Sequence, residues 1–157
     1  MKKIISVAQL SSVSRKLKSN GKKIVLAGGC FDILHIGHIG FLEKAKKAGD
    51  SLILLLESDQ AIKLLKGQNR PVNSQQNRAK ILSAVEFVDF VLPLPGPYKA
   101  ADYNALVNKI SPDVIAVTAG DPNLPAKKFQ AKEVGGVVKV VLKKIPEHST
   151  TKLLGYF

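Results

Sequence analysis

A chain of 157 residues is long enough to bury its own core, and it is most simply interpreted as one domain, residues 1–157. Lysine and arginine number 24 against 12 acidic residues, so the net charge of +12 favours polyanionic partners: nucleic acid, an anionic surface or phosphorylated small molecules. No apolar run approaches the roughly 20 residues that cross a bilayer, the start does not resemble a signal peptide, and the single Cys30 excludes an intrachain disulfide, so we expect a cytoplasmic protein with no membrane partner.

The pattern of apolar residues predicts helices and strands that alternate along the chain. Residues 7–18 carry apolar positions at helical spacing, and "SNGKK" ends that helix with a glycine. Further helices are predicted over residues 37–50, 61–67, 74–85, 98–110, 126–136 and from 149, and strands over residues 23–29, 51–59, 87–95, 112–121 and 137–145. Alternation is typical of a parallel sheet covered on both faces. We therefore predict an α/β, Rossmann-like, doubly wound parallel sheet of about five strands, with residues 1–20 as an N-terminal helical extension.

Four polar stretches each follow a predicted strand. They are "GGCFDILHIGHIGF", "ESD", "TAGD" and "IPEHSTT". Ligands of parallel α/β sheets bind at the carboxyl ends of the strands, near the switch in strand order. We therefore expect these stretches to converge on one site.

The first stretch has the features of a phosphate site. Gly28 and Gly29 would let the backbone turn sharply and approach a ligand, and the helix that follows presents its N-terminal N–H groups. His35 and His38 add two hydrogen-bond donors, and Gly37 between them leaves space for a nucleotide. Two imidazoles with no suitably spaced third ligand make a poor zinc site. The alternative is that one histidine caps a turn and the other is packed.

These residues carry a family resemblance. "GGCFDILHIGH" resembles the HxGH signature of the nucleotidylyltransferase superfamily, and "HSTTKLL" resembles its second signature, the Ser/Thr-rich start of a C-terminal helix. With "LKGQNRPVN", "NRAKILSAVEFVDFV" and "SPDVIAV", the chain is most similar to the adenylyltransferase (ADP-heptose synthase) domain of heptose-phosphate enzymes. The resemblance implies that AMP passes from ATP, accompanied by Mg²⁺, to a phosphorylated small molecule such as heptose 1-phosphate, with release of pyrophosphate.

The resemblance also implies the site residues. His35, His38 and Lys66 would be catalytic, and the nucleotide would contact Gly28, Gly29, Cys30, Phe31, Asp32, Gly37, Arg78, Gly120, Asp121, Ser149, Thr150 and Thr151. Lys66 and Arg78 are the expected cationic partners, and a solvated surface charge is the alternative for each. Asp32 could hold the turn rather than touch the ligand. No carboxylate cluster is evident, so the metal ligands stay unassigned.

One departure from the heptose enzymes leaves alternatives open. Those enzymes carry a lysine and two glycines before the aspartate that follows the fourth strand, where this chain has Thr118, Ala119, Gly120 and Asp121. CTP-dependent glycerol-3-phosphate cytidylyltransferases and FMN adenylyltransferases share both signatures and remain alternatives. A class I aminoacyl-tRNA synthetase also carries "HIGH", but this chain has no "KMSKS"-like loop. The non-enzymatic alternatives are a nucleotide sensor and a basic nucleic-acid-binding protein, and the paired signatures argue against the latter. The resemblance allows a homodimer, which the sequence itself does not show.

Overall fold

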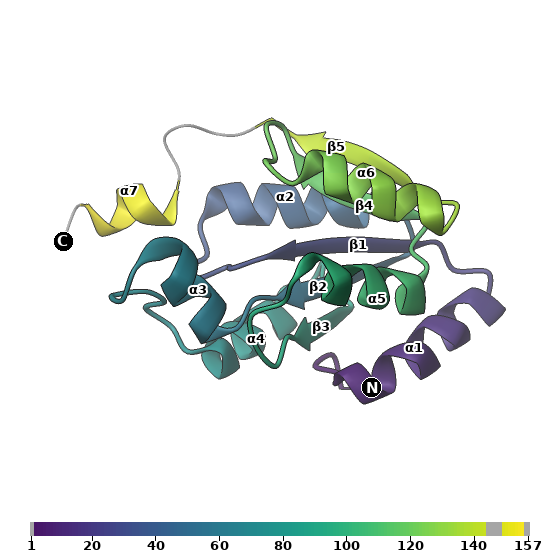
Figure 1. The fold of residues 1–157 in the computed structure, drawn as a ribbon, viewed down its shortest axis with the longest axis horizontal. Helices are drawn as coiled ribbons and strands as arrows, with labels where there is room; N and C mark the ends of the chain where they lie inside the picture. The colour runs from purple at the N-terminus through teal and green to yellow at the C-terminus, as the bar shows by residue number, and fades with distance from the viewer. Residues whose placement is uncertain (1, 144–148, 156–157) are drawn as a thin grey trace.

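The computed structural model describes residues 2–143 and 149–155, and its five described strands form one parallel sheet (Figure 1). The strand order is β3-β2-β1-β4-β5. The strands are β1 (Ile24–Gly29), β2 (Ser51–Leu56), β3 (Phe90–Pro93), β4 (Val114–Thr118) and β5 (Val137–Leu142). The chain moves outward from β1 to β3 and then crosses to β4, so the order reverses between β1 and β4. The carboxyl ends of these two strands are where such a sheet binds ligands.

The helices lie where the sequence predicts them, with ends that differ by a few residues. They are α1 (Val7–Ser19), α2 (Ile36–Lys46), α3 (Asp59–Lys66), α4 (Gln75–Ser83), α5 (Ala100–Ile110), α6 (Leu124–Glu133) and α7 (Thr150–Leu154). Serines cap three of them, because the side chains of Ser58, Ser74 and Ser149 each accept a backbone N–H from the first turn. None of the helices in the described residues has both the length and the apolar character that a membrane crossing requires.

The sheet has an apolar layer on each face. Successive strand residues point to opposite faces, so Val25 and Ala27 of β1 pack with α2 and α4, whereas Ile24 and Leu26 pack with α1, α5 and α6. All six residues of β2 are buried, which explains its continuous run "SLILLL". The predicted five-stranded parallel sheet with helices on both faces is therefore confirmed. In Figure 1, α3 and α7 lie beyond the end at which β1 finishes.

Candidate active site

The histidine loop, residues 30–35, joins β1 to α2. Its sharp turn occurs at Phe31, whose φ of 46° lies in the left-handed region that non-glycine residues rarely adopt. The turn expected at Gly28 and Gly29 is thus displaced, since neither glycine has a positive φ. Gly29 has a steric role instead, because a Cβ there would lie 3.0 Å from the Phe31 ring. Absence of a side chain at residue 29 lets that ring fold back over the end of β1.

The two imidazoles of the loop stack on one another. Their ring centroids are 3.9 Å apart at an interplanar angle of 29°, and the Phe31 ring lies 5.3 Å from that of His38. His35 is the N-cap of α2, and its Nδ1 accepts the Gly37 N–H at 3.1 Å. When the His35 ring is neutral, its proton therefore lies on Nε2. His38 Nδ1 is buried and has no hydrogen-bond partner among the described residues. One histidine caps and the other packs, as the structural alternative requires, yet both remain at the start of α2 where an anion would bind.

His38 is held in its neutral form. Burial, followed by the nearby charges of His35 and Lys66, lowers the pKa of His38 to about 4, although a hydrogen bond with the backbone of Ile33 acts in the opposite direction. A neutral imidazole can donate one hydrogen bond and accept another. Near neutral pH, His38 can thus bind a phosphate oxygen without a change of charge when its single N–H is directed at that oxygen and not at the Ile33 backbone.

We expect the His38 ring to titrate with a midpoint near pH 4 and not near the ordinary value of about 6.5. The unfolded chain binds this proton more readily than the folded chain, so His38 should make the free energy of unfolding rise with pH between about 4 and 6.5. The measurement is the NMR chemical shift of the ring protons against pH, with a His38→Gln variant to assign the signal. A midpoint at 6 or above would contradict the burial argument.

Asp32 and Arg70 form a buried ion pair behind the histidine loop. The side chains are 1% and 9% exposed, and Arg70 Nε donates to Asp32 Oδ2 at 2.7 Å. The carboxylate also accepts the backbone N–H groups of Val72 and Asn73, and Asn73 Nδ2 donates to the Asp32 carbonyl at 3.0 Å. Burial alone raises the pKa of Asp32, but the hydrogen bonds from Asn73, Val72 and Arg70 outweigh it and leave the pKa lowered. The sequence leaves two roles open for Asp32, holding the turn or touching the ligand. These contacts support the first.

Arg78 is fully buried and directed at the protein itself. Its guanidinium donates to the carbonyls of Cys30 at 2.6 Å, Glu57 at 2.9 Å and Asn73 at 3.0 Å, and to the Asp59 carboxylate at 2.8 Å. It therefore joins the segments that follow β1 and β2 to the loop before α4. Direct contact with a nucleotide, which the resemblance implies, would require Arg78 to give up some of these bonds.

Lys66 is exposed at the end of α3, close enough for its charge to act on the histidine loop. It lowers the pKa of His38 and opposes the effect of burial on Cys30. Burial nevertheless leaves the pKa of the Cys30 thiol raised, so this thiol stays protonated and is a weak nucleophile. Gly67, with φ of 97°, ends α3 directly after Lys66. Lys66 is thus fixed at a helix end that faces the site.

The C-terminal signature contacts the histidine loop. Thr150 is buried, and its Oγ1 donates to the Ile33 carbonyl at 3.2 Å. Ser149 caps α7 by accepting the Lys152 N–H at 3.2 Å, and Thr151 is exposed. Residues 145–148 of the stretch "IPEHSTT" lie outside the described residues. The structure thus brings together two signatures that are more than 100 positions apart in the chain.

The loop after β4, residues 119–123, is linked to a cavity that meets the histidine loop at the end of β1. Gly120 has φ of 75°, which favours glycine, and the Asp121 carboxylate accepts the Asn123 N–H at 2.8 Å and the Lys127 ammonium at 2.7 Å. Lys127 in turn lines a cavity of about 780 Å³ between α3, α5 and α6, which reaches the end of β1 at Gly28. Gly120 and Asp121 are thereby linked to this cavity through Lys127.

Comparison with known proteins identifies the family. The cytidylyltransferase-like family matches residues 26–153, a span that contains the first signature and all but the last residue of the second. The chain belongs to the cytidylyltransferase-like family. Its predicted class, nucleotidyltransferase, is confirmed by this match together with the relatives below.

The curated relatives of this cytidylyltransferase-like chain are much longer proteins. It is 42% identical over 136 residues to the "Bifunctional protein HldE" of Wolinella succinogenes, covering 85% of the chain and 26% of that protein. It is 43% identical over 140 residues to the protein of the same name from Campylobacter fetus, covering 89% and 28%. The chain therefore spans about a quarter of the length of these relatives.

Solved structures agree with the fold. A lipopolysaccharide core biosynthesis protein from Thermoplasma volcanium is 26% identical with a TM-score of 0.63, over 80% of this chain and 98% of that one. Pantoate-beta-alanine ligase from Francisella tularensis is 18% identical with a TM-score of 0.65, over 94% and 69%. The latter likeness concerns the fold alone.

Several residues of this cytidylyltransferase-like site carry no clear signal in the sequence. Arg70 lies in a loop, where arginine is usually solvated, and the sequence does not reveal that Asp32 buries it. Tyr103 lies in an amphipathic helix, yet its hydroxyl donates to Glu57 Oε1 at 2.5 Å in the cavity wall. The position of "ESD" after a strand is the one signal that pointed to Glu57.

Proposed function

We propose that the chain transfers AMP from ATP to a phosphorylated small molecule, with heptose 1-phosphate as the acceptor, and releases pyrophosphate. Its resemblance to ADP-heptose synthase domains supports this acceptor, as do relatives whose names refer to HldE and to lipopolysaccharide core biosynthesis. Both apolar layers pack on one sheet, which supports the interpretation of residues 1–157 as one domain.

The observation that carries the proposal is the hydrogen bond from Thr150 Oγ1 to the Ile33 carbonyl at 3.2 Å. It sets the C-terminal signature against the histidine loop, which ends at His35 and leads into the first turn of α2, where His38 lies. Hydrogen-bond donors from both signatures are then available around one triphosphate. A protein that merely retained the fold would have no need to keep the two signatures in contact.

The proposed reaction is a displacement at phosphorus. An oxygen of the acceptor phosphate forms a bond to the α-phosphorus of ATP, and the bond from that phosphorus to the bridging oxygen of the β-phosphate breaks. A phosphate monoester has a second pKa of about 6, so it is largely dianionic at neutral pH and needs no general base. The demand on the protein is to hold two polyanions together and to stabilise charge on the phosphoryl oxygens. Neutral His38 and cationic Lys66 suit that demand, and a covalent enzyme intermediate is not required.

The remaining expected contacts stay proposals of the same kind. Ser149 and Thr151 would donate to the β- and γ-phosphates, while Asp32 and Arg78 would act indirectly by holding the histidine loop in place. Within the described residues no three His, Cys, Asp or Glu side chains gather where they could hold a metal ion. Magnesium would arrive with the triphosphate, which is how this ion usually binds phosphates.

We expect pyrophosphate release with Mg²⁺, ATP and D-glycero-β-D-manno-heptose 1-phosphate, and none with the other pairs of a grid that crosses ATP, CTP, GTP and UTP with this acceptor, glycerol 3-phosphate and FMN. Thr118, where heptose enzymes carry lysine, would then be compatible with the activity. Turnover confined to CTP and glycerol 3-phosphate, or to ATP and FMN, would keep the mechanism and overturn the acceptor. Nucleotide binding with no turnover would favour a sensor.

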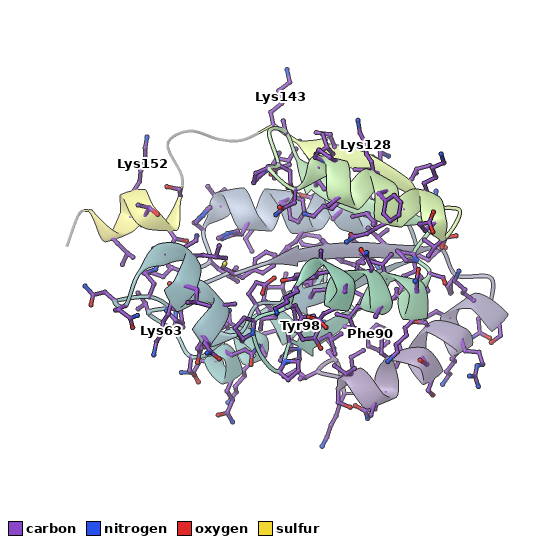
Figure 2. All side chains as sticks on the ribbon, viewed as in Figure 1. Lys63, Phe90, Tyr98, Lys128, Lys143 and Lys152 are labelled. Atoms are coloured by element: carbon purple, nitrogen blue, oxygen red, sulfur yellow. The ribbon has the colours of Figure 1, made fainter. Side chains whose placement is uncertain are left out.

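The nucleic-acid alternative is tested by combining this grid with a measurement of DNA and RNA binding. Lys63, Lys128, Lys143 and Lys152 project outward from four separate parts of the molecule (Figure 2), which does not resemble a single basic stripe. Binding of duplex DNA or of RNA that weakens steeply with salt, in a chain that releases no pyrophosphate, would favour that alternative.

A further inference from the structure

We propose that Glu57 determines which acceptor this chain accepts: the cavity between α3, α5 and α6 receives the non-phosphate end of the acceptor, and the Glu57 carboxylate selects one that presents a neutral hydroxyl there. The inference rests on the proposed function and adds the acceptor subsite and its selectivity.

The cavity adjoins the surfaces proposed to bind the triphosphate and extends away from them. The imidazoles lie at the start of α2, on the α2 and α4 side of the sheet, whereas the cavity is lined by α5 and α6, which cover the opposite face. Gly28, Gly29 and Cys30 line one end of the cavity, so it meets the histidine loop at the end of β1. A ligand whose phosphate lies at the histidine loop can therefore extend its other end into this space. A volume of about 780 Å³ lies within the usual range of small-molecule sites.

Glu57 supplies an uncompensated negative charge in the cavity wall. The Tyr103 hydroxyl donates to its Oε1 at 2.5 Å, and burial followed by this contact raises the pKa of Tyr103, which keeps the phenol protonated. An ionised carboxylate has about four lone-pair positions, so Tyr103 occupies one and leaves others for a ligand hydroxyl. Among the residues that the structure describes, Lys127 is the one cation that lines the wall, and it is already neutralised by Asp121 at 2.7 Å.

This local charge contrasts with the whole chain. The net charge is +12, yet the ionised groups of the cavity wall are Glu57 and the ion-paired Lys127. A carboxylate accepts hydrogen bonds from hydroxyls but repels a phosphate or a second carboxylate. The acceptor should therefore enter with its phosphate toward the histidine loop and a neutral, hydroxylated end toward Glu57.

The rest of the wall suits the body of a sugar. The side chains of Asn104 and Gln130 hydrogen-bond to each other at 2.9 Å and provide amide groups. Apolar side chains form the mouth, and Leu64, Leu65 and Phe129 are 73%, 72% and 57% exposed. Large exposed apolar side chains around a cavity are typical of a ligand site. They can pack against the C–H face of a sugar ring while Glu57 binds its hydroxyls.

The test measures binding and turnover in four variants. Glu57→Gln removes the charge, Tyr103→Phe removes the hydroxyl, and Ala126→Trp fills the cavity from α6. Lys128→Trp is the matched control, because Lys128 lies on the same helix, does not line the cavity and projects outward (Figure 2). The probes are heptose 1-phosphate and heptose 1,7-bisphosphate, which adds a phosphate at the far end. Their affinities are measured by calorimetry with saturating α,β-methylene-ATP, and KM is measured for ATP and for heptose 1-phosphate.

We expect Glu57→Gln to weaken heptose 1-phosphate binding about tenfold or more, since hydrogen bonds to a charged carboxylate are stronger than those to a neutral amide. The same change should reduce the preference for heptose 1-phosphate over the bisphosphate. Tyr103→Phe should change the same affinity less, Ala126→Trp should abolish it, and Lys128→Trp should leave it unchanged. KM for ATP should stay within about twofold throughout.

The outcomes separate this inference from the proposed function. If heptose 1-phosphate turns over but Glu57→Gln and Ala126→Trp leave its affinity and KM unchanged, the cavity inference is overturned and the function stands. If the wild type binds heptose 1-phosphate through Glu57 and releases no pyrophosphate, the function fails and the inference stands. Failure of the wild type to bind either sugar phosphate overturns the inference.

Discussion

His38→Ala is expected to lower kcat for pyrophosphate release by about 100- to 1,000-fold, which is the usual cost of removing one preorganised donor from a transition state. His38 stacks on His35 and packs against Phe31, so its ring has little freedom. With its pKa lowered to about 4, it presents the same neutral donor across the physiological range. A donor that is already oriented costs no reorganisation when charge develops on the phosphoryl oxygens.

The measurement is kcat for ATP and heptose 1-phosphate, with the melting temperature of each variant as a check on folding. Lys44→Ala, an exposed change on α2, is the matched control and should leave kcat unchanged. His38→Asn keeps a donor near the same place and should recover part of the rate. An unchanged kcat in His38→Ala would remove this residue from the proposed mechanism.

The fold could be predicted because its signals are local. The continuous apolar run of β2 and the glycines that end the preceding helical patterns each specify an element from a few neighbouring residues. The alternation of strands and helices then restricts the arrangement to a parallel sheet with right-handed connections. The position of the sharp turn is less predictable. Gly28 and Gly29 predict a turn at their own positions, but the positive φ lies at Phe31. Gly29 instead leaves room for the Phe31 ring.

The site likewise has one part that local sequence predicts and one part that it does not. The histidine loop is contiguous in the sequence and could be identified from it, as could the Ser/Thr-rich start of α7. Most partners of Asp32, Arg78 and Glu57 could not, because, apart from Asn73 at 5 positions from Arg78, they lie 19 to 48 positions away and the side chains involved resemble ordinary solvated ones. Long-range polar pairs of this kind depend on how the elements pack, which residue spacing does not encode.

The hydrogen bonds of Asp32 and Arg78 connect the same segments of the chain. Asp32 holds residues 70–73 through its carboxylate, and Arg78 holds the carbonyls of Cys30, Glu57 and Asn73. The segments after β1 and β2 and the loop before α4 are thus joined by two buried, charged side chains. Removal of Asp32 would leave the buried Arg70 charge unpaired, and removal of Arg78 would leave three carbonyls without their donor, so each loss should cost more than the bonds themselves contribute.

Asp32→Ala is expected to lower the free energy of unfolding by about 3–5 kcal/mol at pH 7, because it leaves Arg70 buried without its partner. Urea denaturation measures the change. Glu43→Ala is the matched control, since it breaks an exposed, solvent-screened pair with Lys47 at the end of α2 and should leave the free energy of unfolding nearly unchanged. Arg70→Met also breaks the pair, but it leaves the Asp32 carboxylate with the N–H groups of Val72 and Asn73 as partners, so it should cost less than Asp32→Ala.

The pH dependence gives a second test of the same pair. The pKa of Asp32 is lower in the folded chain than in the unfolded chain, where it is about 3.9. Its contribution to stability is therefore complete above that unfolded value and is lost as the pH falls through the folded pKa. The difference in unfolding free energy between wild type and Asp32→Ala should accordingly shrink when the measurement is repeated near pH 3 and below. A difference that is the same at pH 7 and in acid would mean that Asp32 stabilises the loop by packing alone, and the histidine loop would then not depend on the charge behind it.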